Sequence, residues 1–337
     1  MKVTAKGVLK YVLVTLLTAL LLYLAFRGVN WSEFLNYVKG CNYWWILASA
    51  FMGLLATISR GFRWRVMMLP ISPQLKRIEC YDAYAICYIA NLAFPRIGEF
   101  VRCGILADTK KVTFEQAFGN MMVERTWDIV VTGVIAVAMV LFTRFGSFIV
   151  EKMWQPMKEG MPALWIILVV LLLALFVGFF VLVFMKEETL NKFRLGRKLS
   201  KFLGGLKAGI KSTFKMSAKQ QISFFSNTLF IQICYWLQVL FIFYAFEPFN
   251  SLSGMDAFFL YVVGCMAWMV PVQGGFGAYH GLLTLALVSI YGMEYNTSLA
   301  FATISHESQI LQMIICGIIS LIHVAIVKSR RAKEIKE

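Results

Sequence analysis

The sequence has little charge: only 15% of its 337 residues are Asp, Glu, Lys or Arg, whereas 59% are hydrophobic. Several long stretches carry almost no charge at all, which is typical of helices that cross a bilayer. Hydrocarbon offers no water to exposed backbone groups, and these stretches are too long for barrel strands, so the spanning elements should be helices. The sequence therefore predicts an all-α, polytopic integral membrane protein.

The sequence also lacks several common motifs of nucleotide-binding proteins and soluble enzymes. It has no Gly-x-x-x-x-Gly-Lys-Ser/Thr nucleotide loop, no His-Glu-x-x-His motif, no Gly-x-Ser-x-Gly elbow and no polar stretch long enough for a catalytic domain. Its seven cysteines are odd in number and scattered, which indicates neither a disulfide framework nor a metal site. From these patterns we expect no catalytic residue, no metal and no cofactor.

The net charge of +15 is concentrated in segments that border the apolar stretches. Residues 186–220 have the pattern of a basic amphipathic helix that lies on an anionic lipid surface, and the C-terminal tail is basic as well. Because Lys and Arg gather on the cytoplasmic side, we expect these segments and both termini to be cytoplasmic. The lipid surface accounts for the charge, and no nucleic-acid partner is expected.

Six apolar stretches have the length of full spans. The first follows lysines, as a secretion signal does, but it is long and lacks a clear cleavage site, so we interpret it as a retained span. The predicted spans are 8–26, 43–59, 114–142, 162–185, 222–246 and 298–327.

Two further apolar stretches, 80–107 and 257–291, are broken near their middle by Pro and Gly. With the basic segments inside, the first begins and ends inside and the second begins and ends outside. The chain then divides into halves, 1–160 and 161–337, of opposite orientation, which is the arrangement of an inverted-topology repeat with two re-entrant hairpins whose tips meet. The alternative is that both stretches are pairs of full spans kinked by Pro and Gly.

The first hairpin carries charges beside its break. Arg96 follows Pro95, where a second half-helix would begin, and the free N–H groups of a helix N-terminus favour an anion. Arg102 adds a second planar guanidinium, so a phosphate is the expected guest, and Glu99 lies three residues from both arginines. The alternative is an internal ion-pair cluster, or a surface position if the hairpin is shallow.

Other charges lie near the ends of spans. Glu124, Arg125 and Asp128 are candidates to organise the site, with an ion pair expected between Arg125 and Asp128, but an interfacial anchor explains them equally well. Arg63 ends the second span, where a cytoplasmic anchor is the alternative to a binding role.

The second hairpin carries no arginine. Its break offers exposed backbone and an amide, either for a ligand or for tight packing, from Gln273, Gly274, Gly275 and Gly277, with His280 in the following helix.

The last span carries polar residues at helical spacing. Ser305, Gln309 and Gln312 form a stripe that should face the bundle interior or a wet cavity. His306 and Glu307 lie alongside and are candidates for proton coupling, with a hydrogen-bonded packing histidine as the alternative.

Four motifs, in this order, resemble the lysylphosphatidylglycerol synthase transmembrane, or flippase-like, family: RGFRW (60–64), NLAFPRIGEFVRCGIL (91–106), ERTWD (124–128) and PVQGGFGAYHGLL (271–283). The resemblance covers nearly the whole chain. It implies a bacterial or archaeal inner-membrane protein that moves a lipid with a charged or phosphate-bearing head group between leaflets, and relatives are also associated with polyprenyl-linked sugars. The family positions that this chain matches are Arg63, Pro95, Arg96, Gly98, Glu99, Arg102, Glu124, Arg125, Asp128, Pro271, Gly274, Gly275 and Gly277.

The chain departs from this family in two ways. The second glycine motif of relatives commonly leads into a Glu, where this chain has Ala278-Tyr279-His280, and the soluble aminoacyl-transferring domain is absent, which argues against lysyl transfer by this chain alone. The resemblance and the charges together predict a lipid translocase. The alternatives are an enzyme acting on lipid-linked sugars or head groups and a non-catalytic partner of a lipid-modifying synthase; a homo-oligomer is a further candidate assembly.

Overall fold

The structure is a computed structural model that describes residues 5–142 and 215–334. These residues are helical and contain no strand, which confirms the all-α fold. The chain forms two compact units, one of residues 1–121 with 222–337 and the other of residues 122–221. The span expected at 162–185 and most of the basic segment 186–220 lie outside the described residues.

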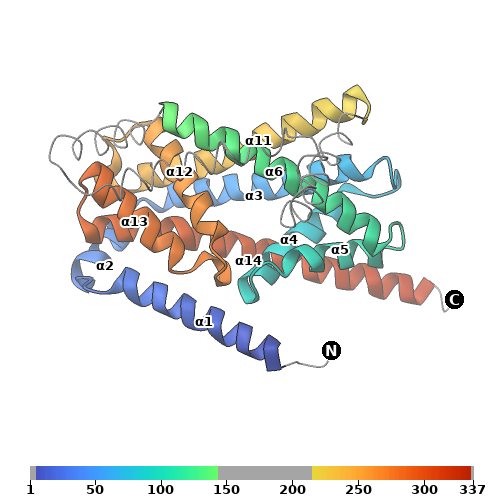
Figure 1. The fold of residues 1–337 in the computed structure, drawn as a ribbon, viewed down its shortest axis with the longest axis horizontal. Coiled ribbons are helices and arrows are strands. Elements are labelled where there is room, and N and C mark those ends of the chain that lie inside the picture. Colours follow the sequence, from blue (N-terminus) through green and yellow to red (C-terminus); the bar gives the residue numbers. More distant parts are fainter. Residues whose placement is uncertain (1–4, 143–214, 335–337) are drawn as a thin grey trace, which may run out of the picture. The chain divides into compact units, whose positions relative to one another are not determined.

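The larger unit holds both predicted hairpins (Figure 1). Two helices, α6 (Phe114–Phe142) and α11 (Ala218–Ala245), have residues in both units. The other elements of the larger unit are α1 (Ala5–Phe26), α2 (Trp31–Gly40), α3 (Tyr43–Met68), α4 (Arg77–Ala93), α5 (Gly98–Asp108), η1 (Glu247–Phe249), α12 (Gly254–Met269), η2 (Gln273–Gly275), α13 (Ala278–Tyr291) and α14 (Tyr295–Glu334).

Three of the described helices are long and apolar enough to cross a membrane: Tyr43–Met68, Ala218–Ala245 and Tyr295–Arg330. They coincide with spans expected from the sequence. A fourth candidate joins Val12–Phe26 to Trp31–Gly40 across a bend of 91°. The protein is therefore an integral membrane protein built from helices.

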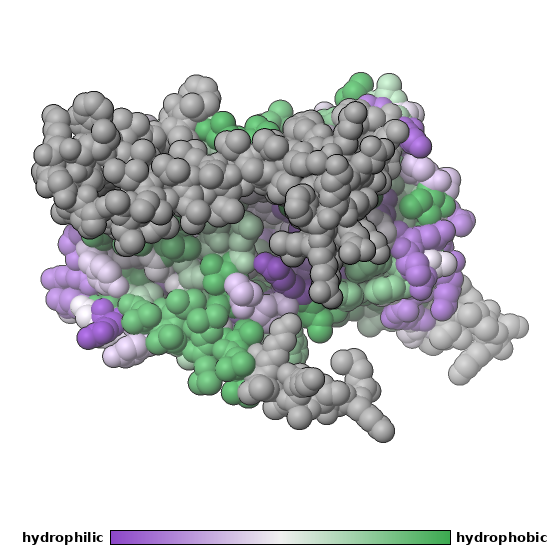
Figure 2. Space-filling view, in the orientation of Figure 1, coloured by the Kyte–Doolittle hydropathy of each residue, from purple (hydrophilic) through white to green (hydrophobic). Residues whose placement is uncertain are grey.

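Exposed apolar side chains cover α1, where Figure 2 shows a continuous hydrophobic area. Leu13, Leu16 and Leu20 are each more than half exposed there. Such a face is costly in water and is expected where a helix contacts lipid. The surface of α1 therefore fits a membrane environment.

The last helix, α14, packs against α2, α3, α4 and α13. Its beginning lies at the α1–α2 bend, where the hydroxyl of Tyr295 donates a hydrogen bond of 2.6 Å to the carbonyl of Ala25. Toward its other end, Lys328 lies 2.5 Å from Asp108, the last residue of α5. The α4–α5 hairpin therefore has its base at one end of α14, and the α12–α13 hairpin, which leads directly into α14, has its base at the other (Figure 1).

The break in the first hairpin follows from Pro95. The residue before a proline is driven out of the helical region, and Phe94 is extended, with φ −138° and ψ 124°. The returning helix begins at Gly98, two residues after Arg96, which is itself in the left-handed region with φ 63°. A Cβ on Gly98 would lie 2.1 Å from the carbonyl oxygen of Cys87, so only glycine lets the two limbs pack this closely.

The break in the second hairpin depends on glycine backbone conformations. Gly274, Gly275 and Gly277 all have positive φ, at 53°, 75° and 77°. A Cβ on Gly277 would also lie 2.6 Å from the backbone nitrogen of Leu22, so this turn lies directly against α1. The tight packing considered as an alternative is therefore present at Gly277.

Candidate functional site

The tips of the two hairpins meet. The guanidinium Nη2 of Arg96 donates a hydrogen bond of 3.0 Å to the carbonyl of Met269, at the end of α12. Close by, a Cβ on Gly274 would lie 3.0 Å from a methyl group of Leu92. We call this contact between residues 91–98 and 269–277 the tip junction. Arg96 is exposed there, so a positive charge is presented where the two broken segments touch.

The structure does not bring Arg102 to the tip junction. Its side chain is fully buried, and its guanidinium carbon lies 4.5 Å from the ring centre of Trp64 and 4.4 Å from that of Tyr84. An arginine between two aromatic faces is held by cation–π attraction on both sides. Arg102 is thus part of the packed core beneath the first hairpin.

Arg63 is also fully buried. Its guanidinium lies 5.7 Å from the ring centre of Phe224, and its Nη1 donates to the hydroxyl of Thr228 at 3.5 Å. Both contacts are with α11, so Arg63 ties α3 to α11 rather than lying on the membrane surface as an exposed anchor.

The N-terminus of α5 is capped by a side chain from the same hairpin. Asn91 accepts a hydrogen bond of 2.7 Å from the backbone N–H of Gly98, which uses one of the amides expected to hold an anion. Glu99 is partly buried and makes no ion pair with Arg96 or Arg102 in the part of the chain that the structure describes. The sequence did not indicate Asn91 as a cap, because it lies seven positions before the amide that it binds.

The acidic and basic residues of the third predicted span belong to the smaller unit. The expected ion pair is present, with Arg125 Nη1 3.2 Å from Asp128 Oδ2, and Glu124 is fully buried. The pairing predicted from the i,i+3 spacing is confirmed.

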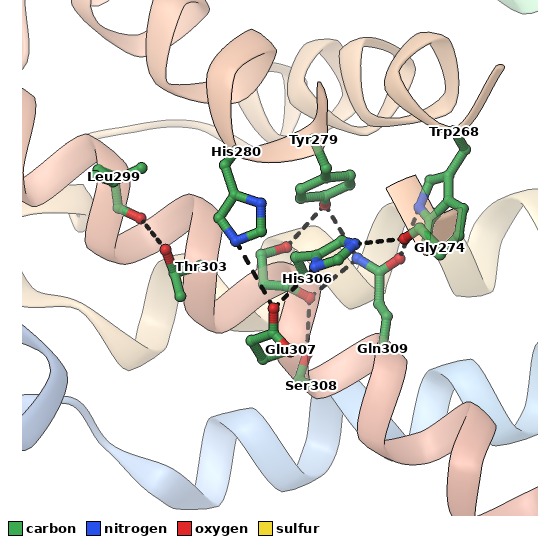
Figure 3. Close-up of polar contacts among 11 residues, drawn as sticks. Trp268, Gly274, Tyr279, His280, Leu299, Thr303, His306, Glu307, Ser308 and Gln309 are labelled. Atoms are coloured by element: carbon green, nitrogen blue, oxygen red, sulfur yellow. Dashed lines mark hydrogen bonds and ion pairs between the residues drawn. The ribbon is translucent and has the colours of Figure 1, made fainter. Parts of the chain in front are cut away.

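A second polar cluster joins α13 to α14 (Figure 3). His306 is fully buried, and its Nε2 lies 2.9 Å from the carbonyl oxygen of Gly274 while its Nδ1 lies 3.1 Å from Glu307 Oε1. His280, which is 1% exposed, places its Nε2 3.7 Å from the same carboxylate oxygen. The structure thus brings two predicted groups together, Gly274 and His280 of the second hairpin and His306 and Glu307 of the last span.

The polar stripe on α14 faces the interior, as the helical spacing predicted. Ser305, Gln309 and Gln312 are all buried. The amide of Gln309 donates to the hydroxyl of Tyr279 at 3.0 Å, and that hydroxyl lies 2.9 Å from Ser305 Oγ (Figure 3). Tyr279 was missed by sequence reasoning, although its place immediately before His280 is a usable signal.

Gln273 lies against α1. Its backbone N–H donates to Thr18 Oγ1 at 3.4 Å, and its side-chain amide donates to Thr15 Oγ1 at 3.2 Å. The ring of Phe26, at the end of α1, lies 5.5 Å from that of His280. The first helix therefore covers the second hairpin, which no short motif in the sequence indicated.

These features define an all-helical integral membrane protein in which two broken helical hairpins meet at their tips. Residues 8–317 match the family described as the lysylphosphatidylglycerol synthase TM region, so the chain belongs to that family. This confirms the resemblance found from the motifs and assigns the protein a lipid-related function in the membrane. No curated protein and no solved structure gives a match.

Proposed function

We propose that this protein is a translocase that moves a phosphate-bearing lipid between the leaflets of the inner membrane. The observation that carries the proposal is the exposed guanidinium of Arg96 at the tip junction. Membership of a family of lipid-synthase membrane regions supports a lipid as the substrate.

The shape of the hairpins supports an inverted repeat with re-entrant segments. At 1.5 Å per residue, the 17 residues of α4 and the 16 of α12 rise about 25 Å, and α5 with 11 residues rises about 16 Å. All three are shorter than a hydrocarbon core of about 30 Å. Hairpins of this length that start from opposite ends of α14 would place their tips inside the membrane, as alternating access requires.

The chemistry of the tip junction suits an anionic head group. Arg96 now donates to a neutral backbone carbonyl, and a phosphate oxygen is a stronger, charged acceptor that can replace it. The acyl or polyprenyl tail would remain in the bilayer along apolar faces such as that of α1. In this proposal Arg63, Glu99 and Arg102 position the first hairpin, and Glu124, Arg125 and Asp128 support the third span.

The distribution of charge supports a cytoplasmic position for the base of the first hairpin. Lys76 precedes α4, Arg77 is its first residue, and Lys110 and Lys111 follow α5, so both ends of this hairpin are basic. By the positive-inside rule the C-terminal end of α14 would lie on the same side. The anionic lipid surface would be contacted there and by the basic segment 186–220.

Lipid translocation in proteoliposomes tests the proposal. Wild type, Arg96→Ala and a control, Arg27→Ala, are reconstituted with lipids labelled on the head group, and a quencher that cannot cross the bilayer reports movement. Arg27 is an exposed arginine outside both hairpins. We expect faster quenching of anionic lipids with wild type and Arg27→Ala and loss with Arg96→Ala. Equal rates in all three, or no movement above empty vesicles for any lipid class, would overturn the proposal.

A further inference from the structure

A cluster of metal-ligand side chains lies where α13 meets α14. The ligand-bearing atoms of His280, His306 and Glu307 all lie within 4.8 Å of one another. Both histidines are buried, whereas the side chain of Glu307 is 44% exposed at the surface of the protein. This combination of enclosed nitrogen ligands and one accessible carboxylate is unusual for packing residues in a membrane helix.

The hydrogen bond to Gly274 determines which ring nitrogen of His306 carries the hydrogen. A backbone carbonyl can only accept, so the Nε2 of His306, 2.9 Å from the Gly274 oxygen, must carry hydrogen. In the neutral ring, Nδ1 then presents a lone pair toward Glu307 Oε1 at 3.1 Å. A lone pair and a carboxylate oxygen repel at this distance, so either a proton, carried by the ring or by the carboxyl, or a metal ion must lie between them.

The position of His280 indicates whether a proton or a metal ion fits better. A proton would bridge His306 and Glu307, but it joins only two atoms, and His280 Nε2 at 3.7 Å from the carboxylate is too distant for a hydrogen bond. In a tetrahedral zinc site, bonds of about 2.0–2.2 Å put neighbouring ligand atoms about 3.4 Å apart. The observed separations from Glu307 Oε1, 3.1 and 3.7 Å, lie on either side of that value.

The surroundings match those of known metal ligands. Metal-binding histidines almost always donate their other ring N–H to a carbonyl or carboxylate, as His306 does to Gly274. His280 differs from His306 in this respect, because its Nδ1 has no hydrogen-bond partner in the described part of the chain; its Nε2 can therefore present the lone pair that binds a metal. Two imidazoles and a carboxylate suit a borderline divalent ion, and three protein ligands leave one tetrahedral position for water.

We propose that His280 Nε2, His306 Nδ1 and Glu307 Oε1 bind a divalent transition-metal ion of the Zn²⁺ class. The ion ties α13 to α14 and, through His306, holds the carbonyl of Gly274 at the turn of the second hairpin. The proposal is independent of translocase activity, because it concerns ion binding alone.

Zinc binding to the full-length protein tests this proposal. The protein is purified in detergent with its affinity tag removed, stripped with chelator, and titrated with Zn²⁺ at about pH 7.5, where histidine is neutral. Metal content is then measured after gel filtration. The chain has 3 histidines, and the third, His323, contacts Asp82 at 2.7 Å outside the cluster, so His323→Gln is the matched control.

We expect one zinc ion per chain in wild type and in His323→Gln. Zinc affinity should fall by more than about 100-fold in His280→Asn and Glu307→Gln, since even changes outside the ligand set cost 10–100-fold. Glutamine has nearly the size of glutamate and the side chain at position 307 is partly exposed, so Glu307→Gln should fold. It therefore tests metal binding even if His280→Asn fails to fold. No stoichiometric zinc in wild type, or equal binding by Glu307→Gln, would overturn the proposal and assign the His306–Glu307 contact to a proton.

Discussion

Arg96 and Met269 are joined by a hydrogen bond of 3.0 Å, although 173 positions separate them in the chain. The bond connects the turn of the first hairpin to the last residue of α12. It is made by a residue whose backbone is in the left-handed region, with φ 63°, where residues other than glycine are strained by about 1–2 kcal/mol. The position of the guanidinium is therefore maintained against a local backbone cost.

Replacement of Arg96 by glycine separates backbone strain from charge. Arg96→Gly removes the strain and the guanidinium together, whereas Arg96→Ala removes only the guanidinium. We expect Arg96→Gly to be more stable than Arg96→Ala by about 1 kcal/mol, with lipid translocation lost in both. Thermal unfolding in detergent and the proteoliposome assay measure the two effects. Retained transport in Arg96→Gly would show that the backbone turn, not the charge, matters.

Replacement of Arg102 by lysine tests the aromatic sandwich. Lysine keeps the charge but loses the flat guanidinium that lies between Trp64 and Tyr84. Because a desolvated cation–π contact contributes about 2 kcal/mol, we expect a loss of roughly 1–3 kcal/mol in the free energy of unfolding. Unfolding can be followed by tryptophan fluorescence, with Arg27→Lys as the exposed control. An unchanged melting temperature would contradict a packing role for Arg102.

Substitution by alanine should affect the stability of the protein differently at Gly277 and at Gly281. Gly277 has φ 77°, and its Cβ would lie 2.6 Å from the backbone nitrogen of Leu22, so Gly277→Ala must push α1 away from the hairpin. We expect a loss of at least about 3 kcal/mol, in the range of the most damaging single substitutions. Gly281 lies inside α13 with nothing within 4 Å of its Cβ, so Gly281→Ala should be neutral or stabilising by up to about 1 kcal/mol. Melting temperatures of the two variants and wild type in the same detergent check both expected changes in stability.

Features set by local physics were predictable from the sequence. Pro95 predicted the break in the first hairpin because it disfavours helical backbone in the preceding residue, and Phe94 is extended. The spacing of Ser305, Gln309 and Gln312 predicted their common buried face. In each case the physical cause acts within a few residues.

Features that depend on distant packing were not predictable. Arg96 and Arg102 are close in the chain, which predicted a common site, but burial between Trp64 and Tyr84 holds Arg102 in the core. His280 and His306 were likewise not expected to meet, because they lie on different helices. Only the packing of α13 on α14 brings these two rings to a centre-to-centre distance of 4.9 Å.

The carboxylate of Glu294, at the start of α14, should make the stability of the protein depend on pH in the acid range. Partial burial alone would raise the pKa of Glu294, but hydrogen bonds from the backbone amides of Asn296 and Thr297, each 2.7 Å, outweigh this and lower the pKa below its ordinary value. A carboxylate with a lowered pKa in the folded state adds stability above its unfolded pKa, and this is lost as the pH falls through the folded pKa.

Glu294→Gln should therefore match wild type at the acid end of this window and be less stable at neutral pH. The carboxylate acts as an N-cap at an exposed position, so we expect a difference of about 1 kcal/mol or less, reduced by salt. Melting temperatures of both proteins from about pH 3 to pH 7 measure it, since the ordinary pKa of Glu is about 4.3. If the difference in melting temperature between Glu294→Gln and wild type is constant across this pH range, the carboxylate charge does not stabilise the start of α14.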